Sequence, residues 1–147
     1  MHKYNNSHRI IYPYTQSLYL YILLNRAYNK RRMAHLDKED FRRGVYDVVR
    51  SIPYGRATSY GAIAKAIGYP NMSRLVGRVM GECDSVISGI PAYRVVNSQG
   101  VLSAKEAFGN SNEMQKLLEE EGVNIINDRI ANWKKVFWDP TEELTIE

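Results

Sequence analysis

The residues that could attack a substrate or move a proton are few in this chain. Cys83 is the single cysteine, and the three histidines, His2, His8 and His35, all precede the first clear helical pattern. The sequence contains no Ser-His-Asp arrangement, zinc-ligand spacing or phosphate-binding glycine loop. Cys83 ends an apolar helical stripe, eight residues after Leu75, which favours a buried structural cysteine. We therefore expect no enzymatic activity, no metal site and no cofactor.

The polar residues that remain are typical of a protein that binds an anionic partner. The net charge is +4, and residues 50–105 alone carry seven basic and two acidic residues. A basic segment of this kind is where a nucleic acid would dock. Every small domain has a charged face, however, so charge alone does not decide between nucleic acid and another partner.

The elements that must position these residues follow from the apolar spacing. From Asp37 the pattern is helical, with a buried stripe that ends before Pro53. Thr58 and Ser59 are potential caps of a short second helix, which Gly68 closes. Pro70-Asn71 opens a third helix. The apolar residues of the three helices are Phe41, Val45, Val48, Val49 and Ile52, then Ile63, Ala64 and Ile67, then Leu75, Val76, Val79 and Met80.

Short strands and one further helix complete the expected fold. The segments 94–96 and 101–102 flank Asn97-Ser98-Gln99-Gly100, a pattern that predicts a β-hairpin, or wing. Asn112 with Gln115 resembles a capping box for a fourth helix that Gly122 ends. Residues 123–126 and 129–130 could pair as a terminal hairpin. The sequence thus predicts a mostly α fold with small β-hairpins, a winged helix-turn-helix.

Three ordered motifs make the interpretation specific. They are Arg56-Ala-Thr-Ser-Tyr60-Gly-Ala-Ile-Ala64, Ser73-Arg74-Leu-Val-Gly77-Arg-Val-Met80 and Ile90-Pro91-Ala92-Tyr93-Arg94-Val95-Val96-Asn97-Ser98-Gln99-Gly100. Over residues 38–122 the chain resembles the O6-alkylguanine-DNA alkyltransferases, and in particular their inactive alkyltransferase-like relatives. The resemblance implies a protein that binds duplex DNA from the minor groove and turns out an alkylated guanine.

The resemblance also implies which residues contact DNA. Arg74 would fill the space that the extruded base leaves, because a planar cation can stack and hydrogen-bond there. Tyr60 would press on the neighbouring phosphate. Gly77 would let the helix approach the groove closely. Thr58, Ser59 and Arg78 would contact phosphates. Each has a simpler alternative: a solvated arginine for Arg74 and Arg78, a core tyrosine for Tyr60, helix packing for Gly77 and helix capping for Thr58 and Ser59.

The chemistry of the active relatives is missing at three positions. Those enzymes need a cysteine nucleophile, a histidine base and a glutamate that orients the histidine. Here the corresponding residues are identified as Ala92, Tyr93 and Gln115. An alanine is no nucleophile, a phenol ionises near pH 10, and an amide would not hold an imidazolium. In the commonest inactive relatives a tryptophan replaces the cysteine, and the alanine here should leave a roomier pocket.

The resemblance further implies a pocket for the lesion. We expect its walls to come from the segments around Met80, residues 91–96 and residues 103–105, with Lys105 close to the lesion or simply facing solvent. The residues are Met80, Pro91, Ala92, Tyr93, Val96, Ser103, Ala104 and Lys105. Ordinary core packing is the alternative for the apolar members of this set.

These expectations combine into one functional hypothesis with two rivals. The chain should bind double-stranded DNA that contains alkylated guanine and mark it for nucleotide excision repair, with excision repair proteins as the implied partners. We expect a cytoplasmic monomer. The first rival is residual alkyl transfer at an atypical site such as Cys83. The second is a winged-helix transcription regulator, which would read undamaged sequences in the major groove.

The first 32 residues differ in composition from the rest. They carry six basic and no acidic residues, and six of the eleven tyrosines. We interpret residues 1–32 as an N-terminal extension or a start assigned too early, and residues 33–147 as the alkyltransferase-like domain. An amphipathic anchor at a membrane surface is the alternative for 1–32. No run of about 18 apolar residues is present, so the sequence predicts no membrane span.

Overall fold

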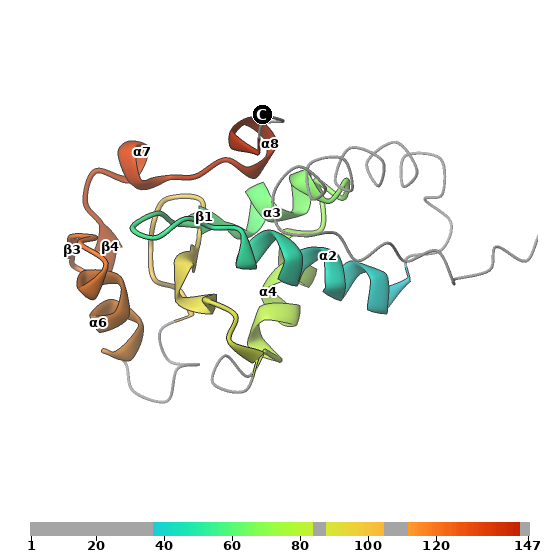
Figure 1. Cartoon of the computed structure of the whole chain (residues 1–147), viewed down its shortest axis with the longest axis horizontal. Helices are drawn as coiled ribbons and strands as arrows, with labels where there is room; N and C mark the ends of the chain where they lie inside the picture. The colour runs from blue at the N-terminus through green and yellow to red at the C-terminus, as the bar shows by residue number, and fades with distance from the viewer. Residues whose placement is uncertain (1–36, 84–87, 105–111, 145–147) are drawn as a thin grey trace, which may run out of the picture.

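The computed structural model describes residues 37–83, 88–104 and 112–144 (Figure 1). Its first described helix is α2 (Lys38–Arg50). The Asp37 side chain caps this helix by accepting hydrogen bonds from the amides of Glu39 and Asp40, at 2.9 and 3.1 Å. The predicted apolar stripe is confirmed, because Phe41, Val45, Val48, Val49 and Ile52 are all buried.

The predicted helix-turn-helix is formed by α3 (Tyr60–Ala66) and α4 (Ser73–Gly81). The Ser59 hydroxyl caps α3 and accepts from the Ala62 amide at 3.1 Å. Gly68 closes α3 in the left-handed region, with φ of +91°, where a side chain would be strained. The third helix begins at Ser73, two residues later than Pro70-Asn71 predicted, because Met72 is its N-cap residue.

The wing is built differently from the predicted hairpin. The strand β2 (Val95–Val96) follows the 3₁₀ turn η2 (Ala92–Arg94) and pairs in parallel with β1 (Thr58–Ser59), with Ser59 opposite Val96. Val101 instead forms an antiparallel bridge with Arg129. Residues 97–101 still form a tight turn, but each arm bonds to a segment distant in sequence, which turn chemistry alone cannot predict.

The C-terminal part begins with α6 (Glu113–Glu120) and the hairpin of β3 (Ile125–Ile126) and β4 (Arg129–Ile130). Both were predicted. Asn127 and Asp128 link the strands with positive φ at both positions, as the tightest hairpin turns require. The predicted capping box is wrong, since the Asn112 side chain makes no hydrogen bond to the start of α6.

The last described segment crosses the domain and was not predicted. It contains α7 (Trp133–Val136) and α8 (Pro140–Glu143). Backbone bonds join Ala57 to this segment on both sides, because the Ala57 amide donates to the Val136 carbonyl and the Trp138 amide donates to the Ala57 carbonyl. Trp138 itself is buried in the core.

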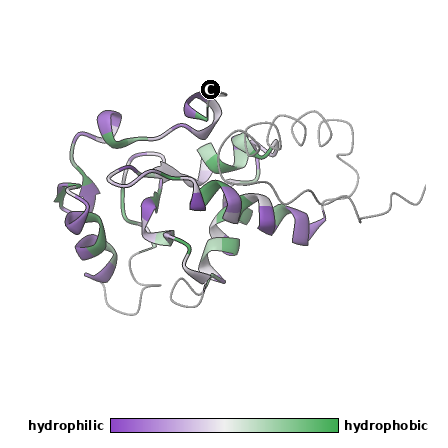
Figure 2. Cartoon of the chain, viewed as in Figure 1, coloured by the Kyte–Doolittle hydropathy of each residue, from purple (hydrophilic) through white to green (hydrophobic). Residues whose placement is uncertain are grey.

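The core consists of two apolar clusters. One joins α2, α3 and α4, and the other lies between the β1–β2 region, α6 and the terminal hairpin. In Figure 2, α2 and α6 alternate between apolar and polar residues around their circumference, as amphipathic helices do. Within the described residues no helix is long and apolar enough to cross a membrane. The predicted extension 1–32 and Lys105 lie outside the described residues.

Candidate nucleic-acid interface

The outer face of α4 carries two arginines. Arg74 and Arg78 are exposed and lie four residues apart, so they share one face of the helix. Val76, Val79 and Met80 hold the opposite face in the core. Within the part of the chain that the structure describes, neither arginine forms an ion pair. Both guanidinium groups are therefore available to an anionic ligand.

Tyr60 lies against the middle of this helix. A Cβ added at Gly77 would lie 3.9 Å from Tyr60 Cδ1, which places the tyrosine ring over the glycine at ordinary contact distance. Burial raises the pKa of Tyr60, and a hydrogen bond with Ser103 acts in the opposite direction. Tyr60 therefore stays protonated near neutral pH and can donate a hydrogen bond to an anion.

Thr58 and Ser59, predicted either to contact phosphates or to cap the second helix, are both buried. Thr58 is fully buried, and its hydroxyl has no hydrogen-bond partner in the described structure. Ser59 is 5% exposed, and its hydroxyl is used to cap α3. The capping alternative is thus realised for Ser59, and a phosphate contact of either residue stays a prediction.

The residues expected to wall the lesion pocket are only partly brought together. Ala92 and Met80 belong to the first core cluster, at 7% and 8% exposure. Val96 is fully buried in the second cluster, which is the core packing given as the alternative for this residue. Tyr93 also packs against the second cluster. Pro91 and Ala104 are half-buried and Ser103 is exposed, as residues near an opening can be.

A carboxylate that the sequence analysis missed contacts Tyr93. The Tyr93 hydroxyl donates to Glu121 Oε1 at 2.6 Å. Gln115, assigned to this orienting position, instead bonds to Glu119 on the outside of α6. The assignment of Gln115 is therefore wrong, and Glu121 occupies the place. Its position before the helix-ending Gly122 was the available signal, but spacing did not show which acid of the Glu119–Glu121 run turns inward.

Glu121 is also the centre of a buried ionic network. Arg94 Nε and Nη2 donate to its carboxylate, and the Gly55 amide donates to Oε2 at 2.9 Å. Arg94 Nη1 donates to the Ile52 carbonyl at 2.8 Å. Burial raises the pKa of Glu121, but the hydrogen bonds from Arg94, Tyr93 and Gly55 outweigh it and hold the pKa below its ordinary value.

The same network keeps Tyr93 protonated. Burial raises the pKa of the Tyr93 phenol, and its hydrogen bond to Glu121 raises it further. A phenol that already ionises near pH 10 thus becomes a still weaker acid. Tyr93 is therefore no base at neutral pH.

Cys83, the single cysteine, lies apart from the three predicted motifs. It lies two residues beyond α4, half-buried, with Sγ 3.5 Å from the Ser88 hydroxyl. It packs against the first core cluster, but it is half-buried and not buried as predicted. Among the described residues, no three His, Cys, Asp or Glu side chains form a group that could hold a metal ion.

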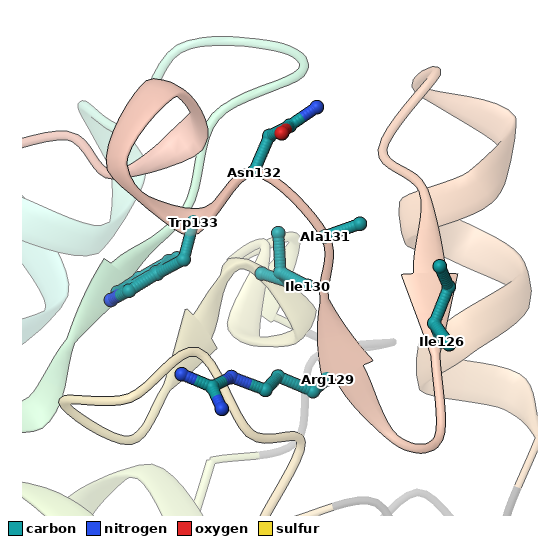
Figure 3. Close-up of a pocket in the computed structure, with 6 residues that line it drawn as sticks. All are labelled: Ile126, Arg129, Ile130, Ala131, Asn132 and Trp133. Atoms are coloured by element: carbon teal, nitrogen blue, oxygen red, sulfur yellow. The ribbon is translucent and has the colours of Figure 1, made fainter.

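Two shallow surface hollows lie away from the predicted lesion pocket. The first is formed by β3, β4 and the start of α7, and Figure 3 shows Trp133, Arg129 and Ile126 around it. The second lies between the start of α3, the 97–100 turn and the C-terminal segment. Its lining residues are Ser59, Gly61, Ala62, Lys65, Ser98, Trp133, Phe137 and Asp139.

The helix-turn-helix, the turn beside it and the free arginines of α4 define a DNA-binding domain of the winged-helix type. Comparison with known proteins supports this class. The family model described as "6-O-methylguanine DNA methyltransferase, DNA binding domain" matches residues 40–123. Alkyltransferase-like protein 1 of Schizosaccharomyces pombe is 34% identical over 106 residues, which are 69% of this chain and 97% of that protein.

Further relatives point to the same family. The DNA base-flipping protein of Escherichia coli is 41% identical over 105 residues, 71% of this chain and 79% of that protein. A crystal structure of the S. pombe alkyltransferase-like protein with damaged DNA containing O6-carboxymethylguanine matches with a TM-score of 0.65 and 33% identity, over 71% of this chain and 100% of that one. The chain therefore belongs to the 6-O-methylguanine DNA methyltransferase DNA-binding domain family.

Proposed function

We propose that this protein recognises O6-alkylguanine in duplex DNA without repairing it. It binds from the minor groove, turns the alkylated nucleotide out of the helix and marks the site for nucleotide excision repair. The S. pombe relative was crystallised with DNA that contains O6-carboxymethylguanine, which supports this ligand class. The family resemblance makes nucleotide excision repair proteins the implied partners.

The observation that carries the proposal is a contrast between two parts of the molecule. The exposed arginines of α4, and the Tyr60 ring packed against Gly77 of the same helix, support binding to DNA. At the reaction position, however, Ala92 offers only a methyl group, and Tyr93 is a weak acid bonded to Glu121. Alkyl transfer needs a nucleophile at this point. The chain thus has groups that can bind DNA, and position 92 lacks the sulfur that would attack the alkyl carbon.

Arg74 supplies the most direct mutational test. An extruded nucleotide leaves a hole whose lost stacking and pairing costs a few kcal/mol. A guanidinium group in that hole would offset part of this cost. We expect Arg74→Ala to lose most of its preference for an alkylated duplex over its unmodified twin while keeping the fold. Fluorescence anisotropy titrations with methyl-, larger-alkyl- and unmodified-guanine duplexes measure this preference.

Two matched arginine variants sharpen the test. Arg78→Ala, on the same face of α4, should weaken binding to damaged and undamaged duplexes alike, since phosphate contacts carry no lesion information. Arg50→Ala removes an exposed arginine that pairs with Asp47 at the end of α2 and should change neither affinity. Full lesion preference in Arg74→Ala, with circular dichroism showing a folded protein, would contradict the assigned role.

A further inference from the structure

The 97–100 turn is held rigidly by its own residues. The Asn97 side chain accepts hydrogen bonds from the amides of Gln99 and Val101, both at 2.9 Å. The Gly100 amide donates to the Asn97 carbonyl at 3.0 Å. Ser98 and Gln99 are exposed at its tip. A polar, pre-ordered turn binds a ligand with little loss of conformational entropy.

The strand pairing places this turn beside the helix-turn-helix. Ser59 and Val96 face each other in the parallel β1–β2 pair. Parallel strands end on the same side, so α3 and the 97–100 turn both start from that end of the pair. The second hollow, which both elements line together with Trp133, confirms their proximity. The turn therefore lies next to the helix that begins with Tyr60.

Residues of the C-terminal part hydrogen-bond to the turn and pack against it. Arg129 Nε donates to the Gln99 carbonyl at 3.0 Å, and Trp133 Nε1 donates to the Ser98 carbonyl at 3.1 Å. The Trp133 ring packs so closely on Gly100 that an added Cβ would lie 2.9 Å from ring atom Cδ2. In Figure 3 the Arg129 and Trp133 side chains extend to the same side, towards this turn.

The bracing segment brings positive charge into an otherwise acidic region. Residues 106–147 carry ten acidic and four basic residues, yet residues 129–135 contain three of the four bases and no acid. Arg129, Lys134 and Lys135 are all exposed. Within the described residues, none of the three forms an ion pair. Arg129 contacts the turn, and Lys134 and Lys135 directly follow Trp133, which packs on it. Three exposed cations on the segment that supports the turn favour an anionic ligand.

We propose that these parts form a second DNA contact, which we name the basic wing: residues 97–100 with Arg129, Lys134 and Lys135. The basic wing binds phosphates of the duplex beside the lesion and lengthens the footprint beyond α3 and α4. This inference rests on the proposed function for the identity of the ligand. It assigns the wing to affinity for the DNA backbone, and it leaves the lesion preference to Arg74.

The salt dependence of DNA affinity shows whether these cations contact phosphates. Each phosphate neutralised by a cation changes the slope of log K against log salt by about 0.9 in magnitude, because counterions are released. The test variant is Lys134→Ala/Lys135→Ala. The control is Lys38→Ala/Lys116→Ala, which removes the same charge from exposed positions on α2 and α6. Both are titrated with undamaged and O6-methylguanine duplexes between 50 and 200 mM KCl, an interval over which such contacts change affinity strongly.

We expect the test variant to reduce the magnitude of the slope by about 1 to 2 on both duplexes, with an unchanged ratio of their affinities. The control pair should keep the wild-type slope within about 0.3. Equal slopes in the test and control pairs would overturn the basic wing, as would a change confined to the damaged duplex. If the wild type shows no lesion preference, the proposed function fails, while the slope on undamaged DNA still decides the wing.

Discussion

At the scale of the residue, contacts around the positions predicted to have lost their catalytic residues converge on Glu121. Its carboxylate accepts from Tyr93, Arg94 and the Gly55 amide, and its side chain is 5% exposed. Arg94 is nearly as enclosed, at 14%, and its guanidinium lies 5.4 Å from the centre of the Tyr93 ring. One buried charge thus joins the loop after α2, the η2 turn and the end of α6, independently of any catalytic role.

The first prediction concerns stability and pH. Glu121→Gln leaves Arg94 enclosed without a counter-ion, and breaking a buried pair costs about 3 to 5 kcal/mol. Because the folded pKa of Glu121 is depressed, its stabilisation is present above an ordinary carboxyl pKa of about 4.3 and is lost as pH falls through the folded value. Urea unfolding between pH 7 and 3 should show a shallower acid dependence in the variant. Identical profiles would contradict the network.

A second prediction concerns the lost chemistry. Glu121, already within hydrogen-bond distance of the side chain at 93, could orient a histidine placed there. The Ala92→Cys/Tyr93→His variant should therefore accept the methyl group of O6-methylguanine DNA. Mass spectrometry should then show one methyl group added per protein molecule. Adding Glu121→Gln should slow this transfer at least tenfold, whereas adding Gln115→Ala should leave it unchanged. The opposite ranking of these two additions would restore Gln115 to the orienting position.

At the scale of the element, α4 has a buried apolar face and an exposed polar face. Its apolar side packs into the core, while the other side presents Arg74, Gly77 and Arg78. Apolar spacing predicted the buried face well, because the 3.6-residue period makes it visible. The start of the helix was missed by two residues, since Met72 makes no side-chain capping bond that a sequence could reveal.

The third prediction concerns Gly77 in α4. A methyl group there would meet the Tyr60 ring at 3.9 Å, which is ordinary contact. Alanine is the better helix former by about 1 kcal/mol. Gly77→Ala should therefore keep or slightly raise the melting temperature yet weaken binding to all duplexes, if the glycine serves close approach to the groove. A loss of stability with unchanged DNA affinity would assign Gly77 to helix packing instead.

Of the strand pairings, the sequence predicted the local one and missed those between distant segments. The terminal hairpin was predicted because its arms are neighbours in sequence and its turn residues tolerate positive φ. The wing was predicted as a similar hairpin, but Val95 pairs with Thr58, 37 residues away, and Val101 with Arg129. Pairing between distant segments depends on how the whole chain packs. For the same reason the burial of Thr58 and Ser59 was not foreseen from their hydroxyl groups.

At the scale of the whole molecule, the packing of the core and of the C-terminal segment fixes the positions of the predicted DNA-binding elements. The core clusters fix α3, α4 and the wing relative to one another, while the C-terminal segment ties back to Ala57 and Arg56. Arg56 donates to the Val136 and Phe137 carbonyls and pairs with Glu143. The three ordered motifs were enough to predict the family and Arg74 on the outer face. They were not enough to identify Glu121, because its inward turn depends on Tyr93 and Arg94.

We propose that the molecule distinguishes an alkylated guanine from a normal one and leaves it unchanged. The most direct measurement is a competition titration of wild-type protein with O6-methylguanine and unmodified duplexes of one sequence, followed by mass analysis of the recovered DNA and protein. We predict at least a tenfold lower Kd for the damaged duplex, with the alkyl group still on the DNA. Equal Kd values, or an alkyl group transferred to the protein, would contradict the account.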